Sequence, residues 1–162
     1  ALMNAPKLLI ADEPTTGLDV TVQAQILDLL RGLVSRFDMA SMIITHDLGI
    51  VAHYCDEVAV MFAGEIIEQG KIRDVFLKPA HPYTQQLLAA TPEQLHLGTK
   101  NQLGGPPPDL FNLPTGCLSQ DRCPLATNAC QNKPPIVKIS SGHTARCHFA
   151  KPLKTSRGKK NG

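Results

Sequence analysis

Two acidic residues and a histidine stand where two short apolar runs of this sequence end. Asp12 and Glu13 follow the run at residues 7–11, and His46 follows the run at residues 41–45. Short, mainly apolar runs without alternation are typical of buried parallel strands, and ligands bind outside the carboxyl ends of such strands in open α/β sheets. A single polar residue there could equally cap a turn or begin a helix. The acid pair and the histidine together therefore indicate a ligand-binding edge.

The elements around these residues are expected to alternate between strand and helix. Apolar residues recur at helical spacing from Val22 to Phe37, between the two runs. Further elements are expected in the order of a helix at 48–54, a strand at 57–62, a turn at 63–65, an antiparallel strand from 66, and short helices at 72–77 and 82–90. Strands that alternate with helices predict an α/β fold with a mostly parallel sheet.

Two segments resemble a known family. Residues 8–19, LLIADEPTTGLD, resemble the Walker B motif and D-loop of an ABC-transporter ATPase, and residues 43–48, IITHDL, resemble its switch-histidine segment. Glu13 and His46 are 33 residues apart, which leaves room for one helix and one strand. An apolar strand that ends in two acids is common, but the joint pattern is highly specific. The resemblance implies the C-terminal part of a P-loop NTPase, with a parallel sheet and flanking helices.

The resemblance also implies roles in the hydrolysis of ATP, where a protein mainly positions groups and stabilises charge. Asp12 would hold Mg²⁺ through water, because Mg²⁺ keeps much of its hydration shell. Glu13 would polarise the attacking water as a general base, and His46 would bridge the γ-phosphate and Glu13. Asp19 would contact the opposite subunit of an ATPase dimer, although it could also cap a helix that begins near Val20. ATP and Mg²⁺ are the cofactors that this reading implies.

Other parts of an ATP site are absent from these 162 residues. The sequence contains no G-x-x-x-x-G-K-[ST], whose backbone would cradle the phosphates, and no LSGGQ signature. In the resembled family both lie before Walker B, and this chain begins at Ala1 without a methionine. We therefore expect the C-terminal part of a longer enzyme. The chain alone is expected to be inactive and to bind Mg-ATP weakly or not at all.

Residues 81–88, HPYTQQLL, narrow the resemblance to the ATPases of oligopeptide and dipeptide importers. This resemblance implies a subunit that energises peptide uptake from the cytoplasmic side of a bacterial inner membrane, as a peripheral protein. Its implied partners are a second ATPase subunit, identical or homologous, transmembrane permease subunits and, indirectly, a substrate-binding protein. The alternatives are an ABC ATPase for nickel or antimicrobial peptides, or a small metal-binding module with a relic ATPase segment.

Charge divides the chain into segments of different character. Residues 1–90 carry six Lys and Arg against eleven Asp and Glu, a net charge of −5, whereas residues 91–162 carry ten against three, a net charge of +7. We expect the C-terminal half of a nucleotide-binding domain at 1–90, an irregular Cys-rich extension at 91–150, and a basic disordered tail at 151–162. The tail has no aromatic residue, so no nucleic-acid partner is expected.

Four cysteines lie in the extension, at Cys117, Cys123, Cys130 and Cys147, and they resemble the cysteines of the same importers. Four thiols in a small Pro-rich segment could hold an iron–sulfur cluster or zinc, could form two disulfides, or could be unligated structural thiols. The resemblance implies a [4Fe–4S] cluster. His143 and His148 could be spare ligands, although a solvated side chain is expected for each, and Cys55 is expected in the core or on a helix face.

Overall fold

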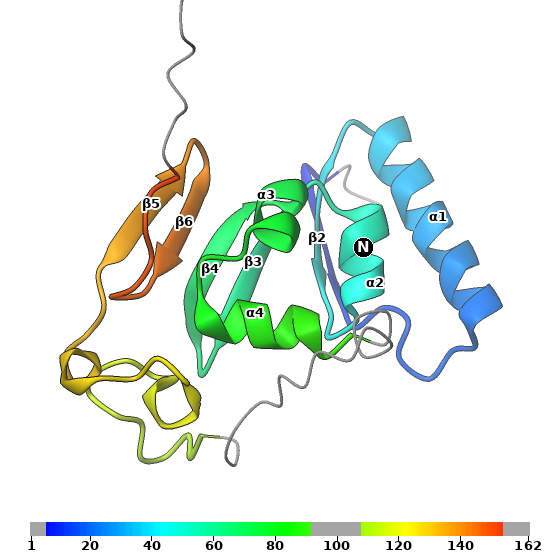
Figure 1. Cartoon of the computed structure of the whole chain (residues 1–162). Helices are drawn as coiled ribbons and strands as arrows, with labels where there is room; N and C mark the ends of the chain where they lie inside the picture. The colour runs from blue at the N-terminus through cyan, green and yellow to red at the C-terminus, as the bar shows by residue number, and fades with distance from the viewer. Residues whose placement is uncertain (1–5, 92–107, 154–162) are drawn as a thin grey trace, which may run out of the picture. The chain divides into compact units, whose positions relative to one another are not determined.

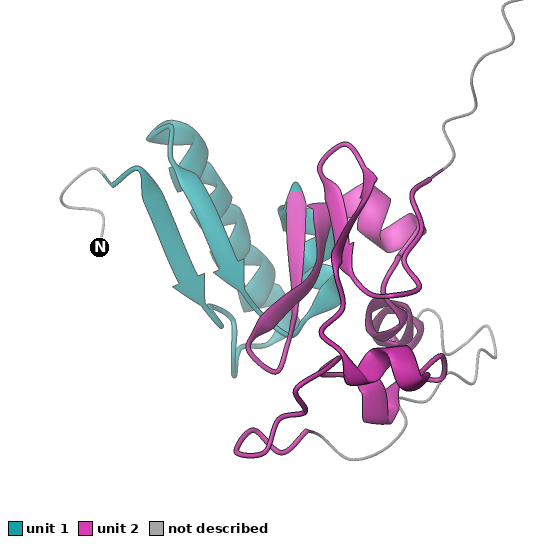
Figure 2. Ribbon diagram, turned by 90° about the vertical axis from the view of Figure 1, so that its left-hand side faces the viewer, with its two compact units in different colours: residues 1–56 teal, residues 57–162 magenta. Residues whose placement is uncertain are grey.

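The structure, a computed structural model, describes residues 6–91 and 108–153. By its internal contacts the chain forms two compact units, residues 1–56 and residues 57–162 (Figure 2). Each unit is described by itself. Residues 92–107 of the expected Cys-rich extension, and most of the basic tail, lie outside the described residues.

The first unit contains two parallel strands joined by a helix (Figure 1). Its elements are β1 (Leu8–Asp12), α1 (Val20–Arg36), β2 (Ala40–Ile44) and α2 (Leu48–Tyr54). Strands β1 and β2 pair in parallel, with Leu8 opposite Ala40 and Asp12 opposite Ile44. Parallel neighbours need a crossover, which α1 supplies. The predicted strands and helices of this unit are confirmed.

The second unit begins with a β-hairpin. Strand β3 (Glu57–Phe62) pairs antiparallel with β4 (Glu65–Lys71), and Ala63 and Gly64 between them both have positive φ angles, 47° and 84°. Two positive φ angles are typical of the tight hairpin turn that matches the twist of the strands. Helices α3 (Ile72–Leu77) and α4 (Pro82–Ala89) follow, as predicted.

The extension is more regular than the sequence analysis expects. It contains two short 3₁₀ helices, Gln120–Arg122 and Asn128–Gln131, and a hairpin of β5 (Ile136–Ser140) and β6 (His143–Arg146). Strand β6 pairs with β4, which gives a four-stranded sheet in the order β3-β4-β6-β5. The expectation of an irregular extension was therefore wrong over residues 136–146. The parallel sheet also differs, because within the described residues it consists of β1 and β2 alone.

A small hydrophobic core holds the second unit together. Its buried residues are Val60, Phe62, Ile67 and Val75, and the Phe62 ring lies 4.6 Å from that of Tyr83, centroid to centroid. Each such aliphatic or aromatic side chain contributes about 1.5–3 kcal/mol when it is fully buried. Partly buried side chains that pack on this core come from both predicted segments: Val58, Ala63, Phe76, Tyr83, Leu87 and Leu118.

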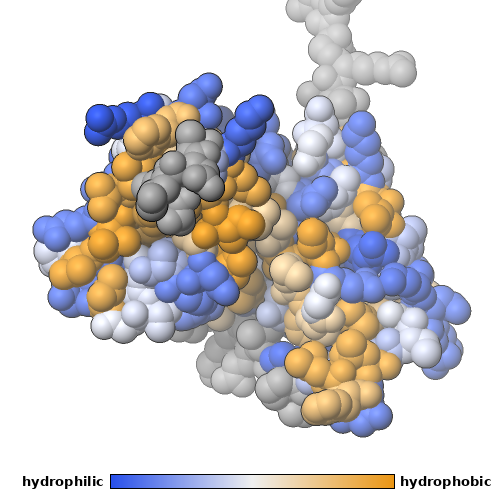
Figure 3. Space-filling view, turned by 180° about the vertical axis from the view of Figure 1, so that it is seen from behind, coloured by the Kyte–Doolittle hydropathy of each residue, from blue (hydrophilic) through white to orange (hydrophobic). Residues whose placement is uncertain are grey.

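The boundaries predicted at residues 90 and 150 stay predictions. Strand β4 lies before residue 90 and its neighbour β6 lies after it, so one sheet draws on both predicted segments. The surface carries several hydrophobic patches (Figure 3), and large apolar side chains of β1 and β2, such as Ile10 and Met42, are about half exposed. In the part of the chain that the structure describes, no helix is long and apolar enough to cross a membrane.

Candidate functional site

The parallel pairing of β1 and β2 brings the ends of these strands side by side. Asp12 is the last residue of β1, and the backbone N–H of Glu13 donates to the carbonyl oxygen of Ile44 at 2.9 Å, which extends the ladder by one residue. Glu13 has a φ of 46°, a left-handed conformation that is uncommon for a residue other than glycine. Such a conformation recurs at functional sites and also at tight turns, as at Ala63 in the β3–β4 hairpin.

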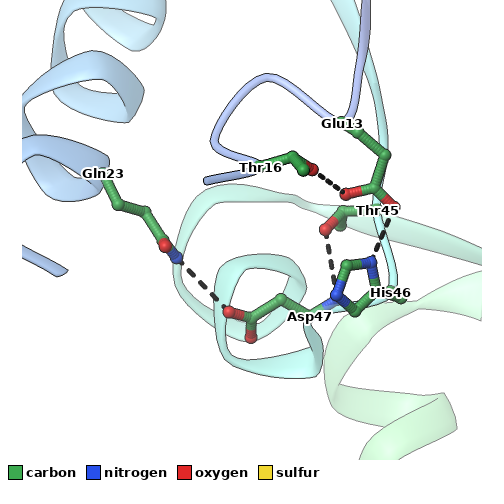
Figure 4. Close-up of polar contacts among 6 residues, drawn as sticks. All are labelled: Glu13, Thr16, Gln23, Thr45, His46 and Asp47. Atoms are coloured by element: carbon green, nitrogen blue, oxygen red, sulfur yellow. Dashed lines mark hydrogen bonds and ion pairs between the residues drawn. The ribbon is translucent and has the colours of Figure 1, made fainter. Parts of the chain in front are cut away.

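Glu13 and His46 form a hydrogen-bonded pair at this edge. The Nδ1 atom of His46 lies 2.8 Å from Oε1 of Glu13, and the hydroxyl of Thr16 donates to Oε2 at 3.1 Å (Figure 4). The hydrogen bond with His46 holds the pKa of Glu13 below its usual range, and the same bond raises the pKa of His46. The His46 side chain is 83% exposed, so its ring is open to a ligand. The arrangement keeps a carboxylate ionised next to an accessible imidazole.

Asp19 lies at the start of α1 and caps it. One of its carboxylate oxygens accepts hydrogen bonds from the backbone N–H groups of Thr21 and Val22, each at 3.0 Å. The capping role that the sequence left open is therefore present, and a contact between Asp19 and a second subunit stays a prediction. Asp12 is exposed at the end of β1, with a carboxylate of the type that Mg²⁺ prefers.

Two residues that the sequence did not single out, Asp47 and Gln23, support the segment that carries His46. Asp47 caps α2 by accepting from the backbone N–H groups of Gly49, at 2.7 Å, and Ile50, at 3.3 Å. Its second carboxylate oxygen accepts from Nε2 of Gln23 at 3.3 Å, so α1 and α2 are linked next to His46 (Figure 4). An Asp directly before an apolar helix is a recognisable cap signal, but a partner 24 residues away is not readable from the sequence.

The four cysteines of the extension lie close to one another. Cys117, Cys130 and Cys147 are buried, Cys123 is half-buried, and the backbone N–H of Cys117 donates to the carbonyl oxygen of Cys130 at 2.8 Å. Burial raises the pKa of Cys123 and of Cys147, and the neighbouring cysteines raise both further. All are free thiols. Across residues 6–91 and 108–153, however, no three His, Cys, Asp or Glu side chains are arranged to hold a metal ion.

A buried polar cluster in the second unit was not anticipated. Glu68 of β4 is fully buried, and its carboxylate accepts from the backbone N–H groups of Ala80, at 2.7 Å, and His81, at 2.9 Å. The Nε2 atom of His143 lies 2.7 Å from the same carboxylate. The expectation that His143 is solvated was wrong, because its side chain is 0% exposed. His148 is half-buried, and its ring lies 3.1 Å from the carbonyl oxygen of Asn132.

Comparisons with known proteins show what the chain as a whole is similar to. Residues 67–130 match the model of the family described as "Oligopeptide/dipeptide transporter, C-terminal region". The "Oligopeptide transport ATP-binding protein OppD" of Salmonella typhimurium is 53% identical over 148 residues, which cover 91% of this chain and 44% of that protein. The "Oligopeptide transport ATP-binding protein AppD" of Bacillus subtilis is 46% identical over 149 residues, which cover 91% of this chain and 45% of that protein.

A solved structure is also similar, "Structure of cbiO1 from clostridium perfringens: Part of the ABC transporter complex cbiONQ". It is 37% identical, matches 57% of this chain and 36% of that chain, and has a TM-score of 0.43.

By sequence the chain is similar to ATP-binding proteins of transporters. Within that class it is similar to oligopeptide and dipeptide transporter proteins, whose C-terminal region matches residues 67–130. The chain spans less than half the length of the curated relatives that it matches.

Proposed function

We propose that this chain is the C-terminal part of an ATPase subunit that hydrolyses Mg-ATP to energise the import of peptides into a bacterial cell. The observation that carries the proposal is the pairing of Glu13 and His46 at the ends of β1 and β2. Its context is a chain that is about half identical to oligopeptide transport ATP-binding proteins. The alternatives of a metal-binding module with a relic ATPase segment, or of nickel or antimicrobial peptides as cargo, are not favoured by these relatives.

In this function the chain provides the groups that act on the terminal phosphate. Glu13, kept ionised by its bonds to His46 and Thr16, accepts a proton from the attacking water. His46 holds the carboxylate in place and donates to the γ-phosphate. Asp12 would hold the hydrated Mg²⁺, which supplies positive charge to the phosphates. The cradle for the other phosphates would come from outside these 162 residues, because the chain has no G-x-x-x-x-G-K-[ST] sequence.

The proposed partners follow from the same family. A second ATPase subunit, identical or homologous, would meet this one at the D-loop around Asp19, and permease subunits would anchor both at the cytoplasmic face of the inner membrane. A substrate-binding protein would deliver the peptide to the permease. ATP binding would bring the two ATPase subunits together around the nucleotides, and hydrolysis would let them separate. Such a change is a rigid-body closure around ligands.

The test uses the full-length protein that carries this chain, with and without Glu13→Gln. Glutamine keeps the shape of the side chain but cannot act as the base, so turnover should fall by about two orders of magnitude or more while ATP still binds. Glu57→Gln is the matched control, because Glu57 is an exposed carboxylate on β3 with no part in the proposed site. Absence of ATP hydrolysis in the unmodified protein, or normal hydrolysis in Glu13→Gln, would contradict the proposal.

For the extension, we propose a [4Fe–4S] cluster at Cys117, Cys123, Cys130 and Cys147. The support is that the four thiols are gathered in one place and that three of them are buried, in a segment with little hydrophobic core of its own. Since no three of these side chains are arranged to hold a metal ion, side-chain rotations would have to accompany cluster binding.

Anaerobic purification of the full-length protein tests the cluster. A brown protein with stoichiometric iron and sulfide that loses both in Cys123→Ser but keeps both in Cys55→Ser supports it. Cys55 is the matched control, since it lies in the first compact unit. A colourless protein with stoichiometric zinc, or with no metal, contradicts it.

A further inference from the structure

Among the described residues, the ring of His46 has one hydrogen-bond partner, Glu13. Its side chain is 83% exposed, and the contact that orients it is the bond of 2.8 Å to Glu13. Because the ring is exposed and hydrogen-bonds to Glu13 alone in the described part of the chain, its position depends on the backbone that carries it. The segment that carries His46 is therefore as important for the pair as the ring itself.

That segment, residues 45–47, is fixed by hydrogen bonds of Thr45 and Asp47, on either side of His46. The hydroxyl of Thr45 accepts from the backbone N–H of Asp47 at 3.1 Å, which closes a small turn around His46. One carboxylate oxygen of Asp47 caps the first turn of α2, and this leaves the other oxygen for a partner outside the segment. Asp47 thus anchors the histidine segment to whatever holds its free oxygen.

The partner of that oxygen is Gln23 on α1. Its Nε2 atom donates to Oδ2 of Asp47 at 3.3 Å, and the pair is partly buried. The backbone N–H of Gln23 donates to the carbonyl oxygen of Asp19 at 2.9 Å, so Gln23 lies one turn after the residue that caps α1. Gln23 is therefore the side chain by which the start of α1 contacts the histidine segment (Figure 4).

We propose that Gln23 is a positioning residue for His46, and that it acts through Asp47. The amide fixes Asp47, Asp47 fixes the turn at residues 45–47, and the turn holds the imidazole against Glu13. The same link connects the cap of α1 at Asp19 with the His46–Glu13 pair, so a displacement at the start of α1 reaches the histidine. The consequence for ATP hydrolysis rests on the proposed function, whereas the consequence for the ring of His46 does not.

An exchange of donor and acceptor tests the link. Gln23→Glu removes the donor and sets two carboxylates against each other, and a hydrogen bond to a charged group is worth enough that we expect kcat of the full-length protein to fall about tenfold. In the double variant Gln23→Glu with Asp47→Asn, the amide of residue 47 donates to the carboxylate of residue 23. Asparagine caps helices as well as aspartate does, so α2 keeps its cap. The double variant should recover most of kcat.

Gln25→Glu is the matched control. It makes the same change of charge on the same helix at an exposed position and should leave kcat unchanged. Full activity in Gln23→Glu, or no recovery in the double variant, overturns the proposal. Recovery in the double variant is a result that general damage to the fold would not produce.

A second measurement separates this proposal from the proposed function. Ring ¹⁵N resonances of histidine-labelled protein report whether Nδ1 of His46 is hydrogen-bonded, and they need no hydrolysis. We expect the resonance to move toward that of a free imidazole in Gln23→Glu and to return in the double variant. If the protein proves not to hydrolyse ATP, the proposed function fails. This resonance still shows whether Gln23 positions His46 through Asp47. A resonance that is the same in all variants overturns the link even if hydrolysis is normal.

Discussion

At the scale of single residues, the carboxylate of Glu13 is held from two sides. His46 contacts Oε1 and the Thr16 hydroxyl donates to Oε2, while the backbone of Glu13 is in a left-handed conformation. Each contact leaves fewer orientations open to the side chain. A general base, the role proposed for Glu13, works only when it is held within reach of the water whose proton it accepts, so under this proposal both contacts should matter for turnover.

Removal of the Thr16 hydroxyl tests the second contact. Thr16→Val keeps the size of the side chain and leaves Oε2 of Glu13 without this donor, so we expect the pKa of Glu13 to rise and kcat of the full-length protein to fall by about threefold to tenfold. Thr16→Ser keeps the hydroxyl and should keep most of the activity. Equal activity in the valine and serine variants would show that the hydroxyl does not position the base.

The sequence identifies some of these residues and not others, for a physical reason. Glu13 and His46 end two apolar runs, and residues at the carboxyl ends of adjacent parallel strands must lie together. The bond between Gln23 and Asp47 depends on how α1 packs beside the start of α2, which spacing along the chain does not reveal. The local sequence pattern therefore predicts the Glu13–His46 pair but not the side chains that support it.

At the scale of elements, the least predictable feature is the hairpin of β5 and β6. Its strands have only five and four residues, in a segment rich in proline and cysteine. Strands this short carry little alternation in their sequence, and the pairing of β6 with β4 joins residues that are more than 70 positions apart. The sequence does not predict the burial of Glu68 either, because glutamate is almost never fully buried unless it is paired.

Glu68 connects three elements, and its loss should be costly. The carboxylate belongs to β4, the N–H groups of Ala80 and His81 lie just before α4, and His143 begins β6. Glu68→Ala would leave these partners buried without an acceptor, and removal of one partner from a buried charged network costs about 3–5 kcal/mol. Chemical denaturation of the two variants Glu68→Ala and Glu57→Ala measures the difference. The exposed Glu57 should change the free energy of unfolding by no more than about 0.5 kcal/mol.

At the scale of the whole molecule, the burial of His81 makes stability depend on pH. Desolvation lowers the pKa of His81 from 6.5 to about 4, even though nearby Glu68 acts in the opposite direction. The unfolded chain binds a proton at this residue below about pH 6.5, and the folded chain does so only below about pH 4. The contribution to stability is therefore complete above pH 6.5 and decreases as the pH falls toward 4, by about 3 kcal/mol in total.

The variant His81→Asn isolates this effect. Asparagine can replace the ring nitrogen that accepts from the backbone N–H of Tyr83 at the start of α4, and it does not titrate in this range. We expect the free energy of unfolding to decrease less between pH 7 and pH 4 in His81→Asn than in the unmodified protein. The same dependence on pH in both proteins would show that His81 is not the titrating group.

The proposed binding of nucleotide also belongs to the scale of the whole molecule. A helix N-terminus with a glycine-rich loop is the usual source of tight binding for the α- and β-phosphates, and these 162 residues contain no such sequence. Glu13 and Asp12 are acids, which repel a phosphate unless Mg²⁺ lies between them. Calorimetric titration of the 162-residue chain with Mg-ATP should therefore give weak binding or none, while the full-length protein binds. Tight, stoichiometric binding by the 162-residue chain would mean that its own residues form a complete phosphate site.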